Sequence, residues 1–454
     1  MQQTLAQSSR VLIVGGGISG LALGQSLSRS HIPFTVFERD PSASFRPQGY
    51  RISHNPKAEE ALKSLVGVDL YGTIRAMGTG DLNTPGLVMA DAVTGENLGP
   101  MPGLGGPSGG KAARVVSTES DKPRDPPGDV SRNPPSRPPA FQSDRTVLRG
   151  LLGLNLEPHI SYGKKFVDFS PAKEGRTILA RFEDGTSEEG AMIVGCDGVR
   201  SKVYSNLLGA LDRPRPTLLD LERRTIYGKT RFTRAFVDAF PEAWRNGVGL
   251  FKDPNNDTKF VFTDAVKFRN RAEDATGGRV KTPEDYLYWA FVTKPEDFAM
   301  TDKELFSLSP DQTAELSLKM TMGWDHKLRA MFEHQDISQC SVLSIQSAHP
   351  DIQDRPSHPH VTIMGDAIHP MSPTGGAGAN TALRDAALLA SLLKSAWNEN
   401  EGWTSGAIGG VIQDYDGQSR SVAKEVLNAA FNTPFAKVMM GGTQPEEYTK
   451  SVSY

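Results

Sequence analysis

Three short runs of glycine and acidic residues could hold a ligand, because each follows a stretch with the apolar, β-branched character of a buried strand. The run at residues 15–20 reads GGGISG and follows RVLIV. Asp197-Gly198 follows AMIV, and Gly365-Asp366 follows HVTIM. Glycine lets a backbone approach a ligand closely, and a carboxylate accepts hydrogen bonds from hydroxyl groups. The pattern predicts ligand-binding turns where buried strands end.

The first run has the spacing G-x-G-x-x-G, with Gly15, Gly17 and Gly20. It lies between a strand at 10–14 and an expected helix, and the next strand ends in Glu38. In such a βαβ unit the first glycine makes the turn, the second admits a pyrophosphate, and the third lets the helix pack on the strand. The acid accepts hydrogen bonds from an adenosine ribose. We therefore predict a dinucleotide site here.

The third run continues through residues 365–390 as GDAIHPMSPTGGAGANTALRDAALLA. Small residues between Pro373 and Gly378 leave backbone N–H groups open, and a helix with apolar spacing follows. The positive end of a helix dipole favours negative charge, which suits an anionic or electron-rich ligand. A purely structural glycine turn is the alternative that this run leaves open when taken alone.

Composition bounds the class of protein. The chain has 454 residues, of which 38% are hydrophobic and 23% charged, with a formal net charge of −3. The length predicts two domains or an interleaved pair. The near-neutral charge argues against nucleic-acid binding, and no stretch approaches the 18 apolar residues of an integral membrane segment. Cys196 and Cys340 form neither a disulfide framework nor a metal motif, so we expect a cytoplasmic protein without a metal site.

The remaining elements must position the three runs. Residues 177–198 alternate like a hairpin that ends in a buried strand. Strand-like runs within 206–350, such as 259–268 and 286–293, predict an antiparallel sheet with one covered face. The chain after residue 390 is expected to be mostly helical to about residue 440.

Residues 99–140 differ in kind from the rest of the chain. They contain 10 prolines and 7 glycines in 42 residues, with few apolar side chains. Such a segment buries too little apolar surface to offset the entropy lost on ordering. We therefore expect a mobile surface insertion, and not a linker between independent domains.

The three runs, in this order, resemble the group A flavoprotein monooxygenases, which share the para-hydroxybenzoate hydroxylase fold. The resemblance covers most of the chain and is weakest across the middle sheet. It implies an α/β fold, in which a Rossmann-like FAD-binding domain accompanies a substrate domain built on a mostly antiparallel β-sheet and a helical C-terminal region. The implied boundaries are 1–98, 141–205 and 351–454 for the FAD-binding domain, 99–140 for the insertion and 206–350 for the substrate-binding domain.

The resemblance also implies which residues meet the cofactors, FAD and NAD(P)H. SDRTVLRGLL resembles the family's R-x-x-L helix start, which makes Arg145 a flavin contact and leaves Arg149 as a surface or outer-layer charge. RPQGYRIS resembles a segment that reaches the flavin, which makes Arg51 a candidate contact. Residues 197–198 would serve both FAD and the nicotinamide donor, and Asp366 would bind ribityl or ribose hydroxyls. The implied cofactor-binding residues are Gly15, Gly17, Ile18, Ser19, Gly20, Glu38, Arg39, Arg51, Arg145, Asp197, Gly198, Gly365, Asp366, Pro373, Gly376, Gly378, Ala379 and Asn380.

Two positions depart from the family's usual pattern. Tyr204 stands where D-G-x-x-S-x-x-R has its arginine, and the loop reads GGAGAN where Gly-Gln-Gly is commoner. None of the nine histidines has a setting that assigns it as a catalytic base. The catalytic residues are therefore left unassigned.

The resemblance implies an FAD-dependent monooxygenase. NAD(P)H would reduce the flavin, O₂ would add at C4a, and the hydroperoxide would hydroxylate or epoxidise a small organic substrate. A role in secondary metabolism is expected. Two alternatives stay open, namely a flavin-dependent dehydrogenase or reductase on the same fold and a non-catalytic nucleotide-binding protein. A non-catalytic protein would purify without flavin colour. Transfer of oxygen to the substrate would separate the monooxygenase from the dehydrogenase or reductase.

Overall fold

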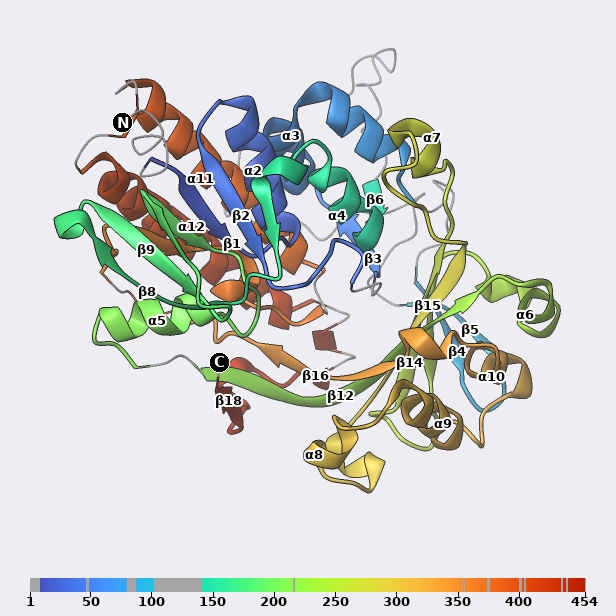
Figure 1. The fold of residues 1–454 in the computed structure, drawn as a ribbon. Helices are drawn as coiled ribbons and strands as arrows, with labels where there is room; N and C mark the ends of the chain where they lie inside the picture. Colours follow the sequence, from blue (N-terminus) through green and yellow to red (C-terminus); the bar gives the residue numbers. More distant parts are fainter. Residues whose placement is uncertain are drawn as a thin grey trace, which may run out of the picture.

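The structure is a computed structural model, and the chain it describes forms two sheet-based parts that a long strand joins (Figure 1). The insertion expected at 99–140 lies outside the described residues except for its first three, so that expectation is not tested. The described residues are 9–45, 49–79, 87–101, 141–214, 217–352, 354, 356–373, 376–399, 402–403, 406–433, 436–437 and 440–453.

The first part is built on a five-stranded sheet whose paired strands all run parallel. Its strands are short, and those at 11–14, 192–195 and 361–363 are wholly buried, as their continuous apolar runs predict. Parallel strands end at a common edge, so the segments that follow them meet there. In spatial order the strands are β17 (Val361–Ile363), β11 (Met192–Gly195), β1 (Val11–Val14), β2 (Phe34–Glu38) and β7 (Ile160–Tyr162).

Both faces of this sheet are covered. Ile13 points to a core formed with helices, whereas the adjacent Leu12 points to a second core under a small antiparallel sheet. The alternation follows from the two-residue period of a strand. The helical face carries α2 (Ile18–Arg29), α3 (Pro56–Ala76), α4 (Arg145–Gly153), α11 (Gly378–Glu399) and α12 (Ala407–Phe431), and the other face β8 (Phe166–Ala172), β9 (Thr177–Phe182), β10 (Ser187–Gly190) and α5 (Lys202–Ala210).

The second part is an eight-stranded sheet in which the paired strands are antiparallel except for one pair. Two segments outside the range 206–350 also pair with strands of this sheet. Residues 88–100 add two strands at one edge, and residues 451–453 pair with β12. The strands are β16 (Ser341–Ser347), β12 (Thr217–Arg231), β15 (Tyr286–Thr293), β14 (Phe260–Val266), β13 (Val248–Lys252), β4 (Val88–Asp91), β5 (Asn97–Pro100) and β18 (Ser451–Ser453).

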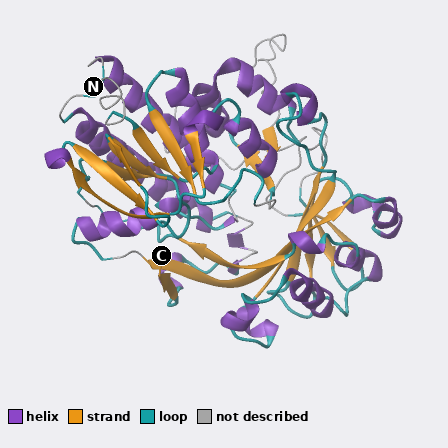
Figure 2. Ribbon diagram, in the orientation of Figure 1, coloured by secondary structure: helices purple, strands orange, loops and turns teal. Residues whose placement is uncertain are grey.

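One face of the eight-stranded sheet, here called the outer face, lies under helices at the rim of the molecule (Figure 2). Trp289 and Phe291 of β15 are fully buried there. The opposite, inner face turns toward the first part (Figure 1). The sheet thus has the covered face that the sequence predicts. The helices of this part are α6 (Arg234–Ala239), α7 (Ala272–Thr276), α8 (Asp302–Leu305), α9 (Pro310–Met320) and α10 (His326–Glu333).

A two-stranded antiparallel ribbon, β3 (Arg51–His54) with β6 (Phe141–Asp144), lies between the two parts (Figure 1). It delivers the chain into α3 on one side and α4 on the other. Helix α3 runs from Pro56 to Ala76 across Gly67, whose φ of 79° interrupts the helical geometry. Single-turn 3₁₀ segments connect other elements, including η6 (Gly365–Ala367). None of the described helices is long and apolar enough to cross a membrane.

Candidate cofactor site

The three glycine–acid runs meet at one edge of the parallel sheet. Gly15 directly follows β1, and Asp197 and Gly365 each lie two residues beyond the ends of β11 and β17. These three strands are neighbours and run in the same direction. The edge to which their carboxyl ends point is where open α/β sheets bind ligands. The topology therefore assembles the site that the strand-then-glycine pattern predicts.

The three glycines of the first run differ in their surroundings. Gly15 has a φ of +113°, and a Cβ there would lie 2.3 Å from the carbonyl oxygen of Cys196. A Cβ on Gly20 would lie 2.1 Å from the carbonyl oxygen of Gly15, so the helix packs directly on the turn. A Cβ on Gly17 would meet nothing within 4 Å. Gly17 also caps α2 without any side-chain hydrogen bond, which leaves the first-turn N–H groups for a ligand.

Glu38 is the buried acid at the end of β2. Its Oε2 accepts hydrogen bonds from the Gly16 nitrogen at 2.9 Å and from Arg149 at 3.3 Å. Its Oε1 accepts one from the Asp40 nitrogen at 2.9 Å. Since each carboxylate oxygen accepts about two hydrogen bonds, Oε1 retains a lone pair for a ligand hydroxyl. Arg39, the next residue, is exposed.

Of the two positions expected for Arg149, surface or outer layer behind the cofactor contacts, the structure shows the second. Its side chain is 14% exposed, and it donates to the carbonyl oxygens of Gly16 and Ala43, each at 2.8 Å. With its bond to Glu38, it ties the glycine turn to the end of β2. Arg149 reaches these atoms because α4 packs on α2.

Both carboxylate oxygens of Asp197 accept hydrogen bonds from nearby groups of the chain. Oδ1 accepts from the Ser201 hydroxyl at 2.6 Å, and Oδ2 from the Lys202 nitrogen at 2.7 Å at the start of α5. Burial raises the pKa of Asp197, against the effect of these hydrogen bonds. The acid therefore fixes the turn at Gly198, where φ is +82° and a Cβ would meet open space. Tyr204, at the family's arginine position, is buried in the core beside β11.

Asp366 lies in η6, against the N-terminus of α11. A Cβ on Gly378 would be 3.6 Å from its Oδ1, and the side chain is open to solvent on this side. Protein atoms around the rest of the carboxyl desolvate it and raise its pKa, while His369 and Arg145 act in the opposite direction. A carboxylate beside a helix N-terminus is an acceptor placed for ligand hydroxyls.

His369 and Asp385 form a buried pair behind this acid, which the sequence analysis did not find. His369 Nε2 lies 2.5 Å from Asp385 Oδ2, and the same oxygen accepts the Gly365 nitrogen at 3.0 Å. Burial lowers the pKa of His369, but the charge and hydrogen bond of Asp385 outweigh it, so the pKa is raised. The signal for this pair in the sequence was Asp385, an acid on the apolar side of the predicted helix.

The loop before α11 is fixed by Asn380. Its Nδ2 donates to the carbonyl oxygens of Ser53 at 2.9 Å and Gly376 at 2.8 Å, and its Oδ1 accepts the Asn55 nitrogen at 3.1 Å. The amide is thereby occupied, so only the backbone here is available to a ligand. Pro373 and Gly376 are exposed, and the Gly376 nitrogen donates to the Pro373 carbonyl oxygen at 3.0 Å.

The two expected arginine contacts face different partners. Arg145 opens α4, with its guanidinium carbon 5.8 Å from the Tyr50 ring centre, and its charge acts on Asp366. Arg51 instead forms an ion pair with Asp264 of β14, where both side chains are largely buried. Arg145 thus lies near Asp366, at the edge of the parallel sheet where the three runs meet. Arg51 is turned toward the eight-stranded sheet.

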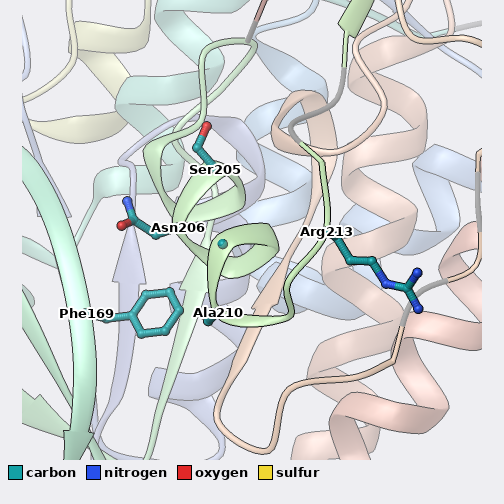
Figure 3. Close-up of a pocket in the computed structure, with 6 residues that line it drawn as sticks. Phe169, Ser205, Asn206, Ala210 and Arg213 are labelled. Carbon is teal, nitrogen blue, oxygen red and sulfur yellow. The ribbon is translucent and has the colours of Figure 1, made fainter.

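A surface pocket lies along α5, and none of the residues that line it belongs to the three glycine–acid runs. Phe169 of β8 and the α5 residues Ser205, Asn206 and Ala210 line it together with Arg213 (Figure 3). None of these belongs to the expected cofactor set. We therefore build the site on the strand edge and not on this pocket.

Comparisons with known proteins identify domains that contain the first and the third of the three runs. Residues 13–68 match the family described as "NAD(P)-binding Rossmann-like domain", and residues 326–430 match "FAD binding domain". The dual O-methyltransferase/FAD-dependent monooxygenase CTB3 of Cercospora beticola is 34% identical over 406 residues, 86% of this chain and 42% of that protein. The FAD-dependent monooxygenase pigN of Monascus ruber is 26% identical over 390 residues, 83% of this chain and 75% of that protein.

The chain therefore spans less than half the length of its dual-function relatives. Among solved structures, 2,6-dihydroxypyridine-3-hydroxylase from Arthrobacter nicotinovorans superposes with a TM-score of 0.66 at 19% identity. The match covers 96% of this chain and 94% of that one, which shows a shared fold. These findings confirm the α/β fold, the FAD-binding domain and the resemblance to flavoprotein monooxygenases that the sequence predicts.

Proposed function

We propose that this chain, a homologue of FAD-dependent monooxygenases, uses FAD, NAD(P)H and O₂ to insert one oxygen atom into a small organic substrate. The observation that supports this most is the convergence of Gly15, Asp197 and Asp366 at one sheet edge, beside two helix N-termini. When bound there, FAD supplies the redox and oxygen-activating chemistry. Relatives from Cercospora beticola and Monascus ruber are named as FAD-dependent monooxygenases, and we propose for this chain a role in secondary metabolism.

The residues at this edge would contact successive parts of FAD, from its ribose to its flavin ring. Glu38 would accept a ribose hydroxyl through the free position on Oε1, with Arg39 beside it. The open Cβ position of Gly17 and the first turn of α2, with Ile18 and Ser19, would admit the pyrophosphate. Asp366 would bind hydroxyls of the linking chain. The backbone from Gly376 to Asn380 would adjoin the flavin ring, where the α11 dipole favours negative charge.

The protein's own contribution is to orient the bound FAD, to place charge beside it and to enclose it. Arg145 and the α11 N-terminus place positive potential beside Asp366, which stabilises an electron-rich ring system next to them. Gly198 provides a second turn with open space, which we assign to the transient nicotinamide donor. Both cysteines are buried free thiols, consistent with a cytoplasmic enzyme.

Replacing Asp366 with alanine should release FAD. The change removes an acceptor for hydroxyls that the bound cofactor would bury, a loss of about 1–3 kcal/mol or roughly 5- to 150-fold in affinity. The measurement is fluorescence titration of the apoprotein with FAD. Asp238→Ala, on the exposed face of α6, is the matched control and should bind FAD normally. An Asp366→Ala protein that purifies with a full complement of tightly held FAD contradicts the assignment.

Labelled oxygen tests the reaction itself. With ¹⁸O₂ and the true substrate, we expect one labelled atom in the product, oxidation of NAD(P)H that depends on O₂, and acceleration of that oxidation by substrate. The physical reason is that only a monooxygenase transfers oxygen, whereas a dehydrogenase or reductase passes electrons to any acceptor. An unlabelled product formed equally well without O₂, using another electron acceptor, would establish the dehydrogenase instead.

A further inference from the structure

One arginine from a helix distant in sequence contacts the place where the ribose of FAD's adenosine half would bind. Glu38, at the end of β2, is the acceptor that we assign to the ribose hydroxyls, and the turn at Gly16 lies against it. Arg149 of α4 donates to both, from Nη2 to Glu38 Oε2 at 3.3 Å and from Nε to the Gly16 carbonyl oxygen at 2.8 Å. Its Nη1 donates to the Ala43 carbonyl oxygen at 2.8 Å, in the segment after β2. Arg149 therefore joins three parts of the chain that lie 106 to 133 positions away from it.

A guanidinium is the side-chain group that suits this arrangement. It is planar, always charged and carries its N–H donors in a rigid fork, so it can reach three acceptors at once with little loss of freedom. The Arg149 side chain is 14% exposed and that of Glu38 is 10% exposed, and solvent screens such a pair less than a pair on the surface. The start of α4 is also fixed, because Asp144 Oδ1 accepts the Thr146 nitrogen at 2.8 Å and the Val147 nitrogen at 2.9 Å. The helix that carries Arg149 and the tip of its side chain are thus both held in place.

These contacts fix the orientation of the Glu38 carboxylate. Oε2 accepts from the Gly16 nitrogen and from Arg149, whereas among the described residues Oε1 accepts only from the Asp40 nitrogen at 2.9 Å. Of these three donors, only Arg149 is charged, and charge-assisted hydrogen bonds are the stronger kind. Loss of Arg149 would leave a buried carboxylate uncompensated and less firmly oriented. The ribose would then have to order this carboxylate when it binds, which lowers affinity.

Arg149 acts at one end of the sheet edge only. The strand order β17-β11-β1-β2 places the end of β2, with Glu38, three strand spacings from the end of β17, beyond which Asp366 lies. Neighbouring strands are about 4.8 Å apart, so roughly 14 Å separates these two strands across the sheet. Arg145, one turn earlier on α4, acts on Asp366. The two arginines of α4 would therefore serve different halves of FAD, with Arg145 at the flavin half and Arg149 at the adenosine half.

We propose that Arg149 is a positioning residue for the adenosine half of FAD and makes the site select FAD over FMN, which lacks that half. Arg149 holds Glu38 and the glycine turn in the arrangement that accepts the ribose, so this part of the site is ordered before FAD binds. The inference rests on the proposed placement of FAD along the sheet edge. It adds to that placement the residue that orients the ribose acceptor.

Fluorescence titration of the apoprotein with FAD and with FMN tests the inference. Arg149→Met keeps an unbranched side chain and removes its donors. For this variant the Kd for FAD should rise about tenfold or more, whereas the Kd for FMN should stay within about twofold of wild type. Arg149→Lys keeps the charge but cannot span three acceptors, so its Kd for FAD should still be raised at least about fivefold. Arg234→Met, at a side chain that is 96% exposed on α6, is the matched control and should bind both flavins as wild type does.

A second comparison measures whether Arg149 acts through Glu38. In a protein that already carries Glu38→Gln, Arg149→Met should raise the Kd for FAD less than about threefold, because the carboxylate that Arg149 orients is gone. If the effects of the two changes multiply fully, the inference is overturned. This comparison decides when FMN binds wild type too weakly to titrate. If Arg149→Met does not fold, Arg149→Lys replaces it in both comparisons.

Three other results would also overturn the inference. Equal weakening of FAD and FMN binding by Arg149→Met would show a general disturbance of the site. Wild-type affinity of Arg149→Lys for FAD would show that charge alone is sufficient. An Arg149→Met protein that binds FAD as wild type does, when Glu38→Gln binds it weakly, would show that Glu38 needs no support from Arg149. If neither change alters the affinity for FAD, the ribose lies elsewhere and the proposed placement of FAD fails, which is a separate outcome.

Discussion

Replacing Gly20 with alanine should destabilise the first part of the protein, whereas Gly17→Ala should leave the fold intact and weaken FAD binding. A Cβ on Gly20 would lie 2.1 Å from the carbonyl oxygen of Gly15, a backbone atom that cannot move without disturbing β1. Overpacking of this kind costs about 1–3 kcal/mol of folding free energy, and a backbone clash lies at the upper end. A Cβ on Gly17 meets no protein atom within 4 Å, so it would occupy space that the ligand needs.

The two variants are separated by measuring stability without cofactor. In urea denaturation of the apoprotein, Gly17→Ala should differ from wild type by less than about 0.5 kcal/mol, the range of a neutral surface change. Its affinity for FAD, titrated by fluorescence, should fall at least about tenfold, because the pyrophosphate must approach this backbone closely. If Gly17→Ala binds FAD as wild type does, the pyrophosphate lies elsewhere and the assignment of the turn is wrong.

The sequence predicts the common edge of the three runs well because local pattern and topology coincide there. A short apolar run followed by a glycine turn and a helix specifies a parallel strand, and parallel strands end together. Gly15, Asp197 and Asp366 could therefore be brought together from patterns alone, although the first and the last are 351 positions apart. The same reasoning identified the hairpin that leads into β11 and the sheet with one covered face.

The features that the sequence could not predict depend on contacts between segments far apart in the chain. Residues 88–100 carry a weak strand pattern, and only their pairing with β13 shows that they extend the eight-stranded sheet. Arg51 has the same residue type whether it meets a flavin or Asp264, and the partner is more than 200 positions away. Arg149 joins Gly16 and Glu38 only because α4 packs against α2. Periodicity does not encode such distant partners.

Breaking the His369–Asp385 pair should give the largest loss of stability, with a pH dependence that identifies the charged form. His369 is fully buried and Asp385 is 2% exposed. Removing one partner of a buried ion pair leaves the other uncompensated, which costs about 3–5 kcal/mol. Asp385→Asn should cost more than His369→Gln, because Asp385 also accepts the Gly365 nitrogen beside Asp366. Denaturant unfolding of the FAD-loaded and apo forms measures both.

The pH dependence follows from the raised pKa of His369. The interaction with Asp385 holds it above the value of about 6.5 expected in the unfolded chain, against the opposing effect of burial. A group whose pKa is raised on folding stabilises fully below the unfolded value and loses that contribution as pH rises through the folded value. The stability difference between wild type and His369→Gln should therefore shrink as pH increases from 6 to 9.

His326→Gln is the control for this experiment, because that side chain is 83% exposed on α10 and should show no such trend. A difference between wild type and His369→Gln that stays constant across the range would mean that His369 is neutral in the folded protein. In that case the pair would act only as a hydrogen bond. A shrinking difference places a protonated imidazole behind Asp366, where its positive charge offsets part of the acid's own charge at the cofactor site.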